Sequence, residues 1–168
     1  MAKEHVLAKV EADLRRGHVH PAMQRLASLN AAYPDDLGLR TRRAALYRQV
    51  CNVAEAGRWG FLSEEASAEE AAAFERSYPG AWQRLLVLKV TVDPSDRLGP
   101  LAGARLRRLV EQAEREGPAP VAWTEGGPRP GEPSSWRDGL GCLVAAVVGL
   151  TAVALAVVGL VTVIRWAR

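Results

Sequence analysis

Apolar positions recur at helical spacing from the start of the chain to about Gly60. Val6, Leu7, Val10 and Leu14 follow one another every three or four positions, and this stripe stops before Gly17. Three more amphipathic segments follow with short connections between them, which indicates that neighbouring helices pack antiparallel. These predicted second, third and fourth helices cover about residues 21–33, 37–50 and 54–60.

The next part of the chain is less regular. Ser67 and Glu70 have the spacing of a capping box, in which the serine accepts from an early helix amide and the glutamate reaches back. A helix is therefore predicted from there to Tyr78. Residues 82–92 fit a helix at their start and a strand at their end, so both remain open. A last amphipathic helix is predicted over residues 101–116.

The strongest signal is a long uncharged run that spans 140–164. A helix over this range rises about 37 Å, more than the ~30 Å hydrocarbon core of a bilayer. We therefore expect a single C-terminal transmembrane helix. Because no signal-peptide pattern precedes the first helix, we expect a tail-anchored, single-pass protein of the cell membrane with its N-terminal domain in the cytoplasm.

The side chains in and around the predicted span indicate how it would lie in lipid. Equal numbers of arginines flank it, so charge alone does not orient it. Small residues at every fourth position form an expected helix-packing face, which would allow a homo-oligomer: Gly141, Ala145 and Gly149. The expected membrane-interface anchors are Trp136, Arg137, Arg165, Trp166 and Arg168.

A segment rich in proline and glycine separates the helical part from the predicted span. Residues 117–135 contain five prolines and four glycines, a density that neither a helix nor a central strand tolerates. We therefore expect a semi-extended tether. The predicted organisation is an all-α domain at 1–116, a linker at 117–138 and an anchor at 139–168.

Two parts of the helical domain match at a fixed offset along the chain. Val19–Ala22 aligns with Val53–Ala56, each after a turn, and Tyr33-Pro34 closes the first unit. A unit of about 34 residues, with two helices, an alanine near the start of the second helix and a closing proline, resembles a tetratricopeptide repeat. The resemblance covers about residues 3–62 and implies antiparallel helical hairpins with a concave face for peptide segments.

A second resemblance lies in residues 57–78. It is to the signature of an uncharacterised bacterial family of small helical proteins, and it implies a repeat-like domain that sometimes carries a membrane span and has no assigned activity. The residues that carry it are Gly57-Arg58-Trp59, Phe61-Leu62 and Ala73-Phe74-Glu75-Arg76. Trp59 and Phe61 suit either core packing or a binding anchor.

Charge and chemistry narrow the function classes. All 19 acidic residues precede Gly139, so the chain up to Asp138 is nearly balanced and offers no basic patch for nucleic acid, although the pI is near 9.2. His18 and His20 lack further ligands at metal spacing, and no nucleophile–base set or phosphate loop can be assembled. The sequence therefore predicts no enzyme, cofactor or metal. Arginine-rich runs at 40–48 and 105–108 suit a solvated helix face or contact with anionic lipid.

The function expected from the sequence is that of a membrane-tethered adaptor or scaffold that binds a protein partner through its helical-repeat surface. The alternative is a structural membrane protein that self-associates through its span. The expected partners are the lipid bilayer and a protein. The repeat offset predicts a partner-binding groove lined by Leu7, Glu11, Arg15, Thr41, Ala45, Arg48 and Gln49.

Overall fold

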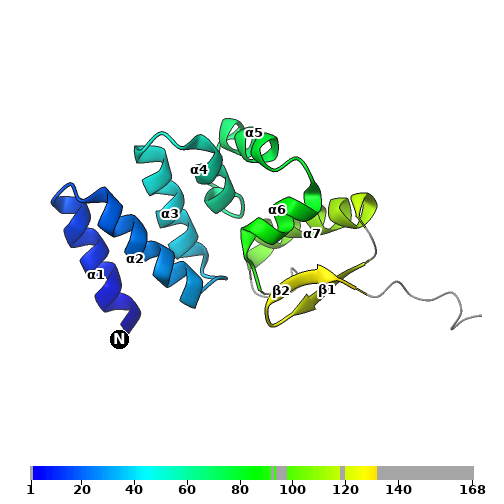
Figure 1. Ribbon diagram of the computed structural model, residues 1–168, viewed down its shortest axis with the longest axis horizontal. Coiled ribbons are helices and arrows are strands. Elements are labelled where there is room, and N and C mark those ends of the chain that lie inside the picture. The colour runs from blue at the N-terminus through cyan, green and yellow to red at the C-terminus, as the bar shows by residue number, and fades with distance from the viewer. Residues whose placement is uncertain (1, 92, 94–97, 118–119, 132–168) are drawn as a thin grey trace, which may run out of the picture. The chain divides into compact units, whose positions relative to one another are not determined.

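Helices dominate the part of the chain that the computed structural model describes, residues 2–91, 93, 98–117 and 120–131 (Figure 1). The prediction that the domain is mainly helical is confirmed. A small β-hairpin, which was not predicted, is also present. The helices are α1 (Ala2–Arg15), α2 (Val19–Ala32), α3 (Leu37–Gln49), α4 (Val53–Gly60), α5 (Ala68–Ser77), α6 (Ala81–Leu88) and α7 (Gly99–Glu116). Strands β1 (Val121–Thr124) and β2 (Gly127–Pro130) form the antiparallel hairpin.

Side-chain caps fix where several helices begin. Asp36 accepts a hydrogen bond of 3.0 Å from a main-chain amide of α3, and Asn52 accepts one of 3.1 Å from α4. At α5 the predicted capping box is present, because Ser67 accepts from the Glu70 amide and Glu70 accepts from the Ser67 amide. These bonds satisfy amides that no helical carbonyl reaches, so the helix starts are encoded locally.

Consecutive helices pack on one another from α1 to α5, and Figure 1 shows them following one another in chain order. Helix α2 begins at Val19 and α4 at Val53, the same offset as the one predicted from the sequence. The apolar stripes of α1, α2 and α3 meet in a first buried core. Its members are Val10, Ala22, Leu26, Leu29, Leu39 and Leu46.

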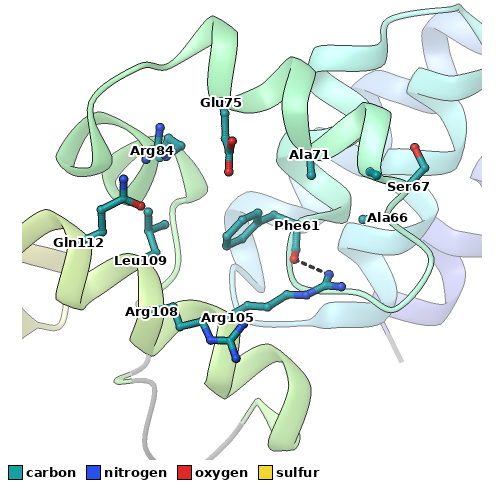
Figure 2. A pocket seen from close by; sticks show the side chains of 11 residues that line it. Phe61, Ala66, Ser67, Ala71, Glu75, Arg84, Arg105, Arg108, Leu109 and Gln112 are labelled. Carbon is teal, nitrogen blue, oxygen red and sulfur yellow. Dashed lines mark hydrogen bonds between the residues drawn. The ribbon is translucent and has the colours of Figure 1, made fainter.

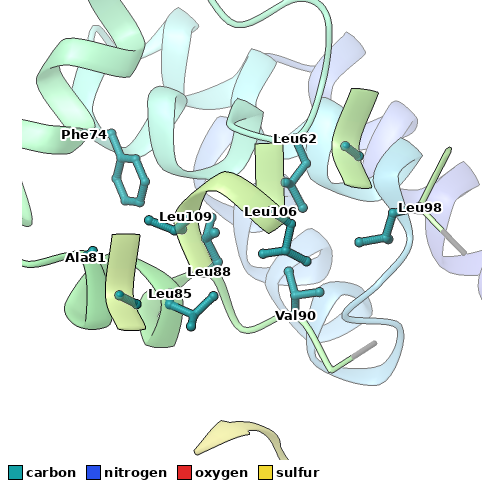
Figure 3. Close-up of a cluster of buried hydrophobic side chains, with 11 residues drawn as sticks. Leu62, Phe74, Ala81, Leu85, Leu88, Val90, Leu98, Leu106 and Leu109 are labelled. Carbon is teal, nitrogen blue, oxygen red and sulfur yellow. The ribbon is translucent and has the colours of Figure 1, made fainter. Parts of the chain in front are cut away.

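A second buried core lies among α5, α6 and α7 (Figure 3). Of residues 82–92, which fit both a helix and a strand in the sequence, the part up to Leu88 belongs to helix α6. Lys89, with a φ of 53°, follows the last residue of the helix. The helix forms because leucines three positions apart reach this core together. Prominent members of the core are Phe74, Leu85, Leu88, Leu106 and Leu109.

The expected semi-extended tether over residues 117–138 needs correction, because its first half is folded. Strands β1 and β2 pair there, and Val121 and Trp123 pack against the second core. Both prolines of β2 are tolerated because, among the residues that the structure describes, β2 pairs only with β1 and its other edge needs no amide donors. Gly127, with a φ of 102°, permits the turn. The compact unit therefore extends to Gly131.

Within the described residues, no helix combines the length and the apolar character that a membrane crossing requires. The predicted transmembrane helix at 140–164 lies outside the described residues. The same holds for the predicted packing face and interface anchors, which are Gly141, Ala145, Gly149, Trp136, Arg137, Arg165, Trp166 and Arg168.

Candidate functional site

A cavity of about 480 Å³ lies between the α4–α5 loop, α5, α6 and α7 (Figure 2). This volume falls in the ~300–1,000 Å³ range of ligand-binding clefts. Its apolar lining includes Phe61, Ala66, Ala68, Ala71 and Leu109. Its polar side chains are Ser67, Glu75, Arg84, Arg105, Arg108 and Gln112. We refer to it as the loop–α7 cavity.

Main-chain carbonyls hold two of the arginines of the loop–α7 cavity. The Arg105 guanidinium donates to the carbonyls of Phe61, at 2.8 Å, and Ser63, at 2.6 Å, and so ties α7 to the loop. Arg84, which is buried, donates to two carbonyls at the α5–α6 turn, at 3.0 and 2.8 Å. Carbonyls carry no formal charge, so these bonds position the guanidinium groups without neutralising them, although the charge of Glu116 also acts on Arg84.

The charges around the cavity are unequal. The lining holds three arginines, Arg84, Arg105 and Arg108, and a single carboxylate, that of Glu75, which points into the cavity in Figure 2. The Phe61 ring lies 5.6 Å from the ring of Phe74, so the apolar lining continues into the second core. The cavity therefore offers apolar surface beside an excess of positive charge, which attracts acidic groups.

The lining residues include one hydroxyl, that of Ser67, and one carboxylate, that of Glu75. The Ser67 hydroxyl accepts from the Glu70 amide at 3.1 Å as the helix cap, and no histidine, cysteine or lysine lines the cavity. The described residues also hold no group of three or more His, Cys, Asp or Glu side chains placed for a metal ion. The lining thus offers apolar surface and charge, which are the features of a binding cavity.

The seven residues predicted to form a groove lie on α1 and α3 and do not line the loop–α7 cavity. Leu7 packs against the first core, and Glu11 accepts from Arg42 at 3.0 Å, which joins α1 to α3. Arg15 and Gln49 are exposed, whereas Thr41 and Ala45 are half-buried. The structure thus places these residues on two helices, α1 and α3, which the Arg42–Glu11 hydrogen bond links.

Arg48, the remaining predicted groove residue, is held in an ion pair. Its guanidinium donates to both oxygens of Glu70, with Nη2 at 2.9 Å from Oε2, and so links α3 to α5. This hydrogen bond lowers the pKa of the Glu70 carboxyl below its ordinary value. Because Glu70 also closes the capping box, Arg48 supports the start of α5.

The sequence left open whether Trp59 and Phe61 are core residues or binding residues, and the structure separates them. Trp59 is only 4 % exposed, whereas Phe61 is half-buried and lines the loop–α7 cavity. Sequence reasoning missed this cavity, although a signal was present. Arg105, Arg108 and Gln112, together with Leu109, have the spacing of one helix face on α7.

Comparison with known proteins gives a family and no activity. The sequence model of a protein family of unknown function (DUF6584) matches residues 1–165. This match agrees with the resemblance to an uncharacterised family seen in the sequence. No curated protein and no solved structure matches the chain.

Proposed function

We propose that this chain, which belongs to the DUF6584 family of unknown function, is a membrane-tethered adaptor that binds an acidic, partly apolar segment of a protein partner. The tether in this proposal is the apolar run at 140–164. The binding surface is the loop–α7 cavity, in place of the groove expected on α1 and α3. The helical-repeat resemblance supports the class of function, because such scaffolds bind peptide segments.

The observation that carries this proposal is the combination of apolar lining and excess positive charge in one cavity. Phe61 and Ala71, both half-buried, offer surface to an aliphatic or aromatic side chain, while Arg105 and Arg108 offer charge to a neighbouring carboxylate. Apolar contact supplies most of the free energy of such binding, and charge complementarity selects the partner. A basic segment would be repelled by the same cavity.

Reversing the charge of Arg108 should weaken binding of such a segment. We expect random-peptide display against the full chain to enrich peptides with Asp or Glu beside Leu or Phe. The Arg108→Glu variant should bind an enriched peptide at least about tenfold more weakly, because the new carboxylate repels the acidic side chain of the peptide. The fold should be kept, because Arg108 is exposed. Fluorescence anisotropy with a labelled peptide measures the difference.

The matched control is Arg76→Glu, which makes the same charge change at an exposed position on α5 that does not line the cavity. Its affinity for the peptide should equal that of the unmodified chain. Enrichment of basic peptides, or equal weakening by both variants, would show that the cavity is not the peptide-binding surface.

Self-association through the predicted span is the second candidate function, favoured by the small residues Gly141, Ala145 and Gly149. Under the adaptor proposal, a chain ending at residue 138 should leave the membrane fraction and still bind the enriched peptide. Under self-association, replacing the three small residues with Leu should convert detergent-solubilised oligomers to monomers. Size-exclusion chromatography with light scattering, run alongside the peptide titration, separates the two.

A further inference from the structure

A second cavity, of about 150 Å³, lies where α2, α3 and α4 meet the end of α6. Four cationic side chains line it, and no carboxylate does. The cations are Arg40, Arg43, Arg58 and Lys89, and the other lining residues are Trp59, Asn30 and two alanines of α2. We refer to it as the Trp59 cavity.

Three of these cations gather on one aromatic ring. The guanidinium carbons of Arg43, Arg58 and Arg40 lie 3.8, 4.9 and 5.1 Å from the Trp59 ring centroid. Each contact with the ring is favourable, but the three charges repel one another. Burial, together with the charges of Arg58 and Arg43, lowers the pKa of Arg40 to about 10. An anion in the cavity would relieve this repulsion.

The protein neutralises only part of this charge. Arg58 pairs with Glu55 at 3.2 Å, and the charge of Asp35 favours the protonated form of Arg40. Arg43 and Lys89, in contrast, form no ion pair within the described residues. The unbalanced positive charge at the cavity therefore comes mainly from these two residues.

Buried polar atoms at the cavity also lack partners. Arg40 is 1 % exposed, its Nη1 donates to the Leu88 carbonyl at 2.8 Å, and its Nε and Nη2 have no hydrogen-bond partner. The Oδ1 atom of Asn30 is also buried without a donor, but it is an acceptor and does not contribute to anion binding. Unsatisfied donors of a buried guanidinium are costly, and they are the groups that recognise oxyanions.

We propose that the Trp59 cavity binds a phosphate group, with the charges of Arg40, Arg43 and Lys89 balancing the anion. The size of the cavity fits this occupant. Its volume corresponds to about five water molecules at ~30 Å³ each, which suits one small oxyanion and falls below the ~300 Å³ at which clefts for larger ligands begin. The site is separate from the loop–α7 cavity, and no residue lines both.

The test is calorimetric titration of the full chain in detergent with inorganic phosphate, at constant ionic strength set with chloride. We expect saturable binding with one phosphate per chain. Arg43→Gln combined with Lys89→Gln should weaken it at least tenfold, because these residues carry the unpaired charge. Arg42→Gln, one position before Arg43 on α3 and paired with Glu11, is the control and should leave the affinity unchanged.

A second arm identifies the source of the phosphate. Soluble short-chain phosphatidic acid carries the same group as a lipid headgroup, and binding at least tenfold tighter than that of inorganic phosphate assigns the site to a headgroup. Equal or weaker binding assigns it to the free anion. The absence of saturable phosphate binding in this titration, or equal binding by the double variant and the unmodified chain, would overturn the proposal. Far-UV circular dichroism of the double variant confirms that the loss is not unfolding.

Discussion

Replacing Gly57 with alanine should destabilise the fold by about 3 kcal/mol, because α4 and α5 approach each other at this glycine. A Cβ atom there would lie 2.0 Å from the Glu70 carbonyl oxygen and 3.1 Å from Cβ of Phe74. The first contact is with main chain, so α5 would have to move as a unit. That movement would disturb the capping box and the Arg48–Glu70 pair as well. Urea unfolding of the full chain, followed by circular dichroism, measures the change.

Gly60→Ala is the matched control on the same helix. Both substitutions replace glycine with alanine in a helix, which favours the helix by up to about 1 kcal/mol. This gain in helix propensity cancels when the stabilities of the two variants are compared. At Gly60 the added Cβ would meet its nearest atoms, on Ala44 and Arg48, at 3.5 Å, which is ordinary contact. This variant should be as stable as the unmodified chain or slightly more stable. Equal stability of the two variants would show that α4 and α5 do not depend on their close approach at Gly57.

The second large effect is expected at Arg40. Arg40→Ala should cost about 3 kcal/mol, because it leaves a cavity under Trp59 and removes the donor of the buried Leu88 carbonyl. Arg40→Met keeps most of the volume and removes a buried, repelled charge, but it still leaves the Leu88 carbonyl without its donor. It should therefore cost less than the alanine variant, about 1–2 kcal/mol. The free energies of unfolding in urea of the two variants, compared with that of the unmodified chain, measure these costs.

Arg42→Ala is the control for Arg40, since it removes the same side chain two positions later on α3. The Arg42–Glu11 pair is about half exposed on both sides, so its loss should cost less than about 1 kcal/mol. If Arg40→Ala were no more destabilising than Arg42→Ala, the buried guanidinium would not be holding α3 to the end of α6.

The helices were predictable because their signals are local. The capping box at Ser67 and Glu70 and the apolar spacing of the first core follow from neighbours in the chain. The hairpin at residues 121–130 was not predicted, since its prolines argue against a central strand and only the tertiary structure makes β2 an edge strand. Residues 82–92 stayed ambiguous in the sequence, because a short apolar run fits a buried helix and a strand equally well.

The loop–α7 cavity shows why sites are harder to predict than elements. Arg105 and Arg108 form a helix face in the sequence, but Phe61 and Arg84 lie far from them in the chain. Arg48 was predicted to be a binding residue of the groove, whereas in the structure its guanidinium donates to Glu70 on a different helix. The carboxylate with which an arginine pairs depends on how the helices pack. The spacing of residues along one helix does not predict that packing.

The sequence by itself determined the helices of the first 60 residues and the helix after Ser67 to within about two residues at their predicted ends. It also determined the repeat offset between α2 and α4 and the uncharged run at 140–164. Capping bonds, helical spacing and hydropathy act over short stretches, so the chain encodes them directly. Only the tertiary structure decided that Arg40 is buried and that four cations surround one small cavity. Those features join α2, α3, α4 and α6, and the free energy that holds like charges together comes from packing across all of these segments.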